Sequence, residues 1–353
     1  MRWLFVCSSG LQFLSAIALV EEEKKRDGAL EVDLILLRSR REILRIEEVI
    51  PKFQVFRKIF VLDDGYVASL KHVFQNPKNF VPRLLGAFKS GRPLARKIQF
   101  GPQLPLDFVN YTDFFVAIEK DVSIWITSNL SKHCRIHQFD DGIGTYLPSV
   151  LPAGIEDFCL FEPELSNCPV EKTRRIAKLS PDNLTVRKTV SALCGCNPVN
   201  LPPVLYVDQY WGANTLRAKH ASEQQQAMWK RRIELIDAVI QEEGIDRSGI
   251  LIHPGSKPVE TDFLRKRYGE NAVIDLNGIP FEAFLLNGAR CPEKIYTVSS
   301  SAAFYWKIAC EVPASTKMIF LVRSFQFDYR GLTIMPAILE KLRQRYPDLV
   351  EIR

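Results

Sequence analysis

The chain has 353 residues, of which 46% are hydrophobic and 25% are charged, and its formal net charge is +6. Two domains are expected, because this length exceeds what one hydrophobic core usually covers. The composition is that of a globular protein able to bury a sizeable core. A charge this small for the length argues against a nucleic-acid partner, but it favours smaller anionic partners such as nucleotides, acidic glycans or a lipid surface.

Eight cysteines are scattered along the chain without the paired spacing of a zinc site. The one close pair is Cys194 and Cys196, and a single intervening residue gives poor geometry for structural zinc. Because no disulfide framework is evident, a reducing cytoplasm is the predicted compartment.

The start of the chain has a largely apolar stretch over Trp3–Val20, which follows Arg2 in the manner of a signal peptide. Polar residues and a glycine interrupt it at Ser8, Ser9, Gly10 and Gln12. A buried strand over Leu4–Cys7, a glycine turn and a helix to about Lys25 fit this pattern better. No other stretch of the sequence is long enough to cross a bilayer.

Strand and helix patterns alternate through the first half, which predicts a parallel sheet with covering helices. The expected strands are Leu4–Cys7, Val32–Leu37, Lys58–Leu62, Phe114–Ala117 and Arg135–Phe139. Helical spacing occurs over Glu42–Val49 and Val122–Ser131. A basic insertion over 76–102 is interpreted either as a solvated helix pair or as an acceptor or membrane contact, so peripheral association with a membrane stays open.

The second half repeats the alternation after an irregular, proline-containing segment. Its expected strands are Val204–Val207, Ile250–His253, Ala272–Leu276, Lys294–Val298 and Lys317–Val322. The clearest helix is Ser222–Glu243, and the last runs from Met335 to about Tyr346. The predicted organisation is a first domain over 1–155, a crossover over 156–203 and a second domain over 204–353.

Three short motifs follow predicted strands, at the position where ligands bind in open α/β sheets. They are Phe139-Asp140-Asp141-Gly142, Ile252-His253-Pro254-Gly255 and Val298-Ser299-Ser300-Ser301. Each has an ordinary structural interpretation: a turn, a satisfied histidine and a helix cap. Together they offer a carboxylate base, an imidazole, and hydroxyl and N–H groups for a phosphate.

In order, spacing and position these motifs resemble those of the bacterial GT-B sialyltransferases, especially the lipooligosaccharide sialyltransferases and capsular polysialyltransferases. Those families carry an acidic-acidic-Gly motif, then a His-Pro motif, then a serine motif. The opening segment Phe5–Gln12 is also similar to the start of those enzymes, with Gly10 where a proline is usual. The resemblance implies an α/β GT-B fold, with two Rossmann-like domains facing a central cleft.

The resemblance also implies residue roles. Asp140 would be the general base with Asp141 in support, and His253 would assist the departing phosphate of CMP. Ser299 and Ser300 would hold that phosphate. Glu282 would bind the ribose hydroxyls, although a first-turn helix glutamate after Pro280 is an equal interpretation. The implied site further includes Gly142, Pro254, Gly255 and Ser301, with Ser8, Ser9, Gln12 and Lys257 as additional candidates.

The implied reaction is inverting transfer of sialic acid from CMP-sialic acid to a hydroxyl of a glycan acceptor. The expected enzyme needs no cofactor and no metal, because a single-phosphate leaving group requires no divalent ion. A metal site at Asp140-Asp141 is a minor alternative. Two further alternatives are another donor, such as CMP-Kdo, a different nonulosonic acid or a UDP-sugar, and a catalytically silent glycan-binding protein. An enzyme of this kind is expected in the cytoplasm, with the inner face of the membrane as an alternative.

Overall fold

The structure is a computed structural model of the whole chain. It describes residues 1–38, 41–50, 54–62, 106–117, 123, 126–127, 129–195, 201–209, 223–256, 258–288, 290–310, 315–325 and 335–353. The basic insertion over 76–102, Lys257 and much of the helix predicted over Val122–Ser131 lie outside these residues.

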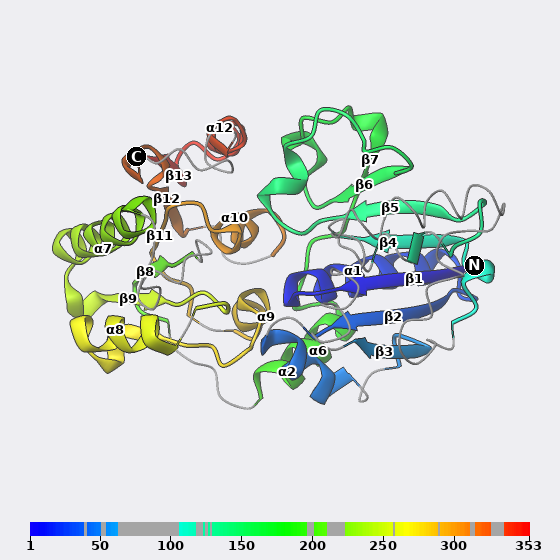
Figure 1. Ribbon diagram of the computed structural model, residues 1–353, viewed down its shortest axis with the longest axis horizontal. Helices are drawn as coiled ribbons and strands as arrows, with labels where there is room; N and C mark the ends of the chain where they lie inside the picture. The colour runs from blue at the N-terminus through cyan, green and yellow to red at the C-terminus, as the bar shows by residue number, and fades with distance from the viewer. Residues whose placement is uncertain are drawn as a thin grey trace.

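The first domain is built on a parallel sheet of seven strands in the order β3-β2-β1-β4-β5-β6-β7 (Figure 1). The strands are β1 Arg2–Cys7, β2 Glu31–Leu37, β3 Lys58–Leu62, β4 Asp113–Val116, β5 Arg135–Phe139, β6 Asp157–Leu160 and β7 Thr173–Arg175. The helices α1 Gly10–Arg26, α2 Arg41–Val49 and α6 Leu184–Cys194 pack against one another beside it. All five strands predicted in this half are confirmed within one or two residues.

The second domain has a parallel sheet of six strands in the order β10-β9-β8-β11-β12-β13. The strands are β8 Val204–Val207, β9 Ser248–Leu251, β10 Val273–Ile274, β11 Lys294–Thr297, β12 Lys317–Phe320 and β13 Val350–Ile352. Its helices are α7 Glu223–Glu243, α8 Pro258–Tyr268, α9 Phe281–Leu286, α10 Ser301–Ile308, α11 Val322–Phe325 and α12 Met335–Arg345. The predicted long helix and final helix are therefore both confirmed.

The segment 156–203 differs from the predicted crossover. Its first part adds β6 and β7 to the first sheet, pairing Phe158 with Thr173. The apolar run at β6 is short and the sequence around β7 is charged, so neither carries a clear strand pattern. Helix α6 follows, capped by Asn183, whose side chain accepts from the N–H groups of Thr185 and Val186. The first sheet therefore continues beyond residue 155.

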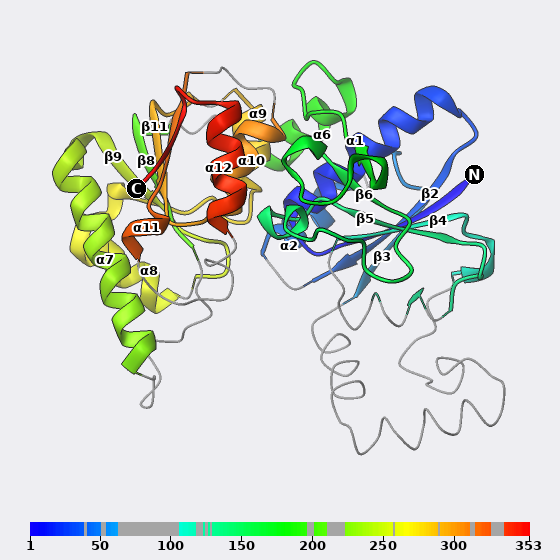
Figure 2. The same cartoon turned by 90° about the horizontal axis from the view of Figure 1, so that it is seen from above.

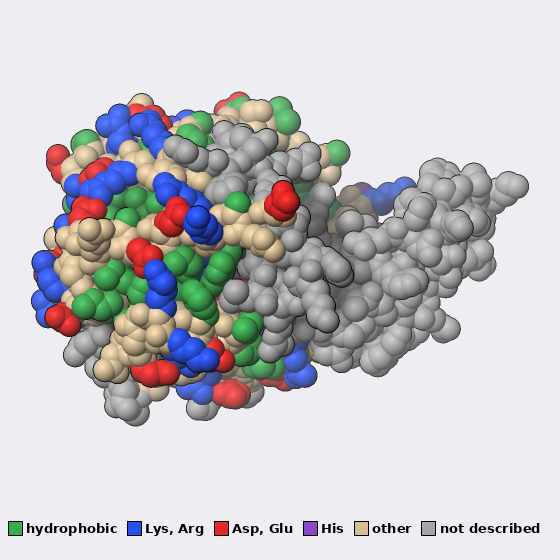
Figure 3. All heavy atoms as spheres, turned by 60° about the vertical axis from the view of Figure 1, so that its left-hand side comes forward, with side chains coloured by type: hydrophobic (Ala, Val, Ile, Leu, Met, Phe, Trp, Pro, Cys, Tyr) green, Lys and Arg blue, Asp and Glu red, His purple; other side chains and the backbone are tan. Residues whose placement is uncertain are grey.

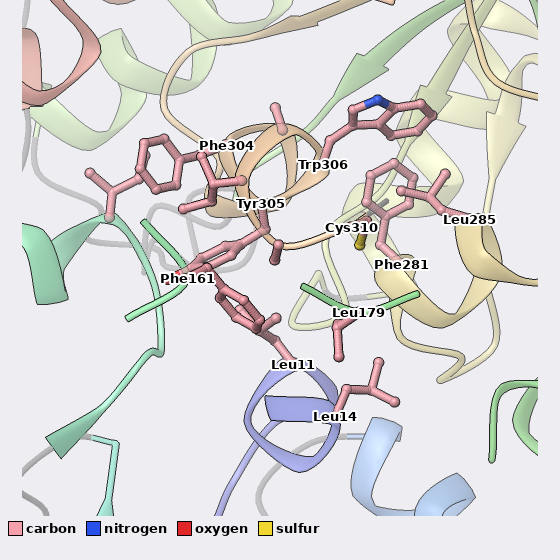
Figure 4. Packing of buried hydrophobic residues seen from close by; sticks show 14 of the residues in the cluster. Leu11, Leu14, Phe161, Leu179, Phe281, Leu285, Phe304, Tyr305, Trp306 and Cys310 are labelled. Carbon is pink, nitrogen blue, oxygen red and sulfur yellow. The ribbon is translucent and has the colours of Figure 1, made fainter. Parts of the chain in front are cut away.

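The two domains lie side by side (Figure 2). They meet over a continuous apolar core (Figure 4). Leu11 and Phe161 from the first domain belong to the same buried cluster as Phe281, Phe304 and Tyr305 from the second. Burial of this apolar surface stabilises the contact of one domain with the other.

The end of α12 contacts the first domain. Lys341 Nζ donates to the carbonyl oxygen of Ser166 at 2.8 Å, and Tyr346 Oη donates to Glu162 Oε1 at 2.6 Å. The final helix therefore packs at the interface between the two domains. Since Glu162 is 1% exposed, this polar contact is shielded from water.

The outer face of the second domain carries Lys and Arg side chains interspersed with Asp and Glu (Figure 3). Ion pairs such as Arg267 with Asp237, at 2.6 Å, occur on this domain. Within the described residues, no helix has the length and apolar character needed to cross a membrane.

Gly10 lies at a close approach between the two domains. A Cβ atom there would lie 2.2 Å from Cγ of Pro280 in the second domain, so this position requires glycine. We predict that Gly10→Ala lowers the free energy of unfolding by about 1–3 kcal/mol through overpacking, measured by chemical denaturation. Gly28→Ala is the control, because a Cβ there meets nothing within 4 Å. Equal stability of the two variants would contradict the contact.

Candidate active site between the two domains

A cavity of about 230 Å³ lies between the domains, at the carboxyl ends of strands from both sheets. The first domain lines it with Ser9, Leu11, Arg41, Glu42 and Asp141. The second domain adds Val207, Asp208, Gln209, Leu251, Ile252, His253, Pro254, Ser256, Asp275, Leu276, Gly278, Ile279, Phe281, Glu282, Ser300, Ser301 and Ala302. All three sequence motifs therefore contribute residues to one cavity.

The opening of α1 orients Asp141. Gln12 Oε1 accepts from the Ser8 N–H at 2.5 Å, which fixes the side-chain amide. Gln12 Nε2 then donates to Asp141 Oδ1. Ser9 caps α1 by accepting from the Gln12 N–H at 3.3 Å. The residues predicted from the opening segment thus support the carboxylate on the cavity wall.

Asp140 does not line the cavity, and its side chain is fully buried. The carboxylate accepts hydrogen bonds from the phenols of Tyr146 and Tyr305 and from the Phe161 N–H at 3.3 Å. Burial raises the pKa of Asp140 to about 7, against the opposing effect of these donors. Its position differs from that expected of a base facing an acceptor.

His253 lies on the cavity wall with its orientation set by its own loop. Its Nδ1 accepts from the Gly255 N–H at 2.9 Å. In the neutral imidazole the other nitrogen, Nε2, therefore carries the proton. Pro254 follows on the same wall, whereas Gly255 contributes through this backbone bond. A neutral histidine so arranged can donate a hydrogen bond from Nε2 to a ligand.

The serine motif forms the start of α10. Ser300 is its N-cap and accepts from the Ala302 N–H at 3.3 Å, while Ser299 Oγ donates to Gln209. Ser300 and Ser301 line the cavity but Ser299 does not. The first-turn N–H groups and the helix dipole attract an anion at this position.

Two carboxylates occupy another part of the wall. Glu282, on the first turn of α9, is 6% exposed, and burial followed by the nearby charge of Glu42 raises its pKa to about 7. Glu42 accepts from the Gly10 N–H at 2.8 Å. Carboxylates placed in this way are acceptors suited to sugar hydroxyl groups.

Several polar lining residues carry no motif in the sequence. They are Arg41, Glu42, Asp208, Gln209 and Asp275. Asp208, Gln209 and Asp275 follow β8 and β10 directly, so position after a strand could have identified them. Arg41 and Asp275 also approach each other at 3.5 Å across the two domains.

No family model matches the chain, and no curated protein matches its sequence. Among solved structures, the 2,6-sialyltransferase of Photobacterium sp. JT-ISH-224, in complex with CMP and lactose, aligns with a TM-score of 0.53 at 11% identity, covering 99% of this chain and 78% of that chain. The α/β-galactoside α-2,3-sialyltransferase of Photobacterium phosphoreum aligns at 0.49 and 11%, covering 99% and 98%. The Arabidopsis thaliana protein UGT89C1, in complex with UDP, aligns at 0.49 and 12%, covering 99% and 85%.

The chain has the GT-B fold. Two parallel α/β sheets with their carboxyl ends at a shared cavity are the arrangement that the sequence predicted. At these identities the similarity establishes the fold alone, and the chemistry of the cavity depends on the residues that line it.

A second polar cluster lies within the first sheet of the GT-B fold. His137 Nδ1, an Asp157 carboxylate oxygen and Cys159 Sγ lie within 4.8 Å of one another, close enough to share a metal ion. However, Asp157 pairs with Arg174 at 2.9 Å, and His137 Nε2 lies 2.9 Å from Asp113. These partners make a buried ion-pair network the better interpretation of the cluster.

The raised pKa of Glu282 predicts a specific dependence of stability on pH. Between its ordinary value of 4.5 and about 7, the folded state keeps a proton that the unfolded state releases, so the free energy of unfolding falls as pH rises. We expect Glu282→Gln to be more stable than the wild type at pH 8 by up to about 3 kcal/mol, and nearly equal at pH 4.

Denaturant unfolding at both pH values measures this difference, with the exposed Glu171→Gln as the control. The pKa of Asp140 is also raised, but both the wild type and the variant contain this residue, so we expect its contribution to cancel in the comparison. A difference that did not change with pH would contradict the assignment.

Proposed function

We propose that the protein is a GT-B glycosyltransferase that moves sialic acid from CMP-sialic acid to a hydroxyl of a glycan. One observation carries the proposal: Asp141 from the first domain lines the same cavity as His253 and the start of α10 from the second. This arrangement supports the proposal, because a base for an acceptor would then share one cavity with groups suited to a phosphate leaving group.

The donor is proposed to lie against the second domain. Its phosphate would accept from Ser300, Ser301 and the first-turn N–H groups of α10, where the helix dipole favours an anion. His253 would donate to the same phosphate as the glycosidic bond breaks. The ribose hydroxyls would donate to Glu282, which has the burial and the cavity position for this contact.

We propose Asp141 as the group that takes the proton of the acceptor hydroxyl. The alternative base, Asp140, is shielded from the cavity and already accepts three hydrogen bonds. Asp141 lines the cavity, and Gln12 holds one of its oxygens, which fixes the direction of the carboxylate. Because this carboxylate is already oriented, an acceptor hydroxyl bound in the cavity would need only a small movement to transfer its proton to Asp141.

Charge stabilisation in this site would come from protein groups. As sialic acid departs, negative charge on one phosphate increases, and the imidazole and helix N–H groups can meet it. The proposal therefore includes transfer without a metal or other cofactor. A different donor, CMP-Kdo or a UDP-sugar, is the second candidate, since the carboxylates of the cavity would accept from many sugar hydroxyls.

The direct experiment incubates the protein with CMP-sialic acid, CMP-Kdo and UDP-sugars in excess EDTA, with a galactose-terminated or sialylated acceptor. Transfer from CMP-sialic acid supports the proposal, and transfer from another donor supports the second candidate.

Asp141→Asn should lower the transfer rate by about 10²–10⁴-fold, the usual contribution of a general base, with CMP affinity retained. The exposed Asp246→Asn is the control. A near-wild-type rate for Asp141→Asn would remove Asp141 as the base.

The phosphate contact is tested separately by Ser300→Ala. Losing a hydrogen bond to a charged group should weaken CMP binding by about 10–100-fold in calorimetry. Because the change also removes a helix cap, Asn183→Ala at the start of α6 is the matched control. If both variants kept wild-type CMP affinity, the phosphate would lie elsewhere.

A further inference from the structure

Helix α10 contacts both the cavity and the buried part of the first domain. Ser300, Ser301 and Ala302 line the cavity from its N-terminal end. Tyr305, about one turn further along, enters the apolar contact between the domains beside Phe161 (Figure 4). The first turn and the middle of this short helix therefore lie in two different environments.

The Tyr305 phenol donates a hydrogen bond to Asp140 Oδ1, across the domain boundary. Both side chains are 0% exposed. Tyr305 also packs edge-on against Phe161, with ring centroids 6.1 Å apart. A hydrogen bond to a charged or partly charged carboxyl group in such a dry site is stronger than one at the surface.

The segment that bears Asp141 is bonded to α10 on one side and lies close to it on the other. Asp140, the residue before it, accepts from Tyr305. Gly142, the residue after it, has φ +152°, and a Cβ there would lie 3.0 Å from Ser301 Oγ. The position of Asp141 in the cavity therefore depends on the position of α10, although the two belong to different domains.

We propose that Tyr305 is a positioning residue that couples the phosphate end of α10 to Asp141. A phosphate at the N-terminus of α10 would fix the helix, and the Tyr305–Asp140 hydrogen bond would then hold Asp141 toward the acceptor. Tyr305 does not line the cavity, so it touches neither substrate. The inference rests on the proposed function for its effect on transfer, but the mechanical link itself requires only nucleotide binding.

Tyr305→Phe keeps the ring packing and removes the phenol. We expect kcat for transfer to fall by about 10–100-fold, because misplacement of a reacting group by about 1 Å has an effect of this size. The Kd for CMP and the KM for the acceptor should stay within about twofold of wild type, since their contacts are unchanged.

Tyr296→Phe is the matched control. Tyr296 is also buried and donates to a carboxylate, Glu243, at 2.6 Å, but both residues belong to the second domain. Loss of the Tyr296 phenol should leave kcat unchanged.

Asp140→Asn should lower kcat as Tyr305→Phe does. The double variant should be no slower than the slower single variant, because both changes disrupt the same hydrogen bond.

A second measurement does not require turnover. Addition of CMP should slow amide hydrogen exchange over residues 139–147 in the wild type, and this slowing should be lost in Tyr305→Phe while protection at 299–303 is retained. Wild-type kcat in Tyr305→Phe, a parallel loss of CMP affinity, or the same kcat loss in Tyr296→Phe would overturn the inference. Wild-type protein that transfers from no donor would instead overturn the proposed function, and the exchange measurement would still decide the link.

Discussion

The hydrogen bond from Tyr305 to Asp140 joins the two halves of the molecule at the place where their sheets converge. It is formed within a shared apolar core, which excludes water from the carboxyl group and raises its pKa to about 7. Asp140 follows β5 of one sheet and Tyr305 lies on α10, which follows β11 of the other. This hydrogen bond and the apolar core around it thus link the two motif-bearing loops directly.

The cavity combines acidic side chains with groups suited to a phosphate. Carboxylates from both domains line it. The charge of Asp208 is balanced by its ion pair with Arg232, and the raised pKa of Glu282, about 7, favours the protonated form of that side chain below neutral pH. Sugar and ribose hydroxyls are natural donors to such groups. In the proposed function, the start of α10 would bind the phosphate and the carboxylates would accept from hydroxyl groups, so a nucleotide-sugar would find partners for both parts.

The fold was largely predictable from sequence because buried strands such as Leu4–Cys7 and Val32–Leu37 carry strong patterns and alternate with helices. The strands β6 and β7 were missed because their runs are short and take their stability from the sheet they join. The position of the motifs after strands correctly predicted that Asp141, His253 and Ser300 share one cavity. Sequence alone could not show that Asp140 is buried, since this depends on Tyr146 and Tyr305, the latter 165 residues away.

The central claim is that the interdomain cavity is a nucleotide-sugar site. A crystal structure of the protein with CMP tests it most directly. The account predicts the phosphate within hydrogen-bonding distance of the first turn of α10 and of His253, with the ribose hydroxyls at Glu282. A nucleotide bound outside this cavity, or a cavity still empty at saturating CMP, would contradict it.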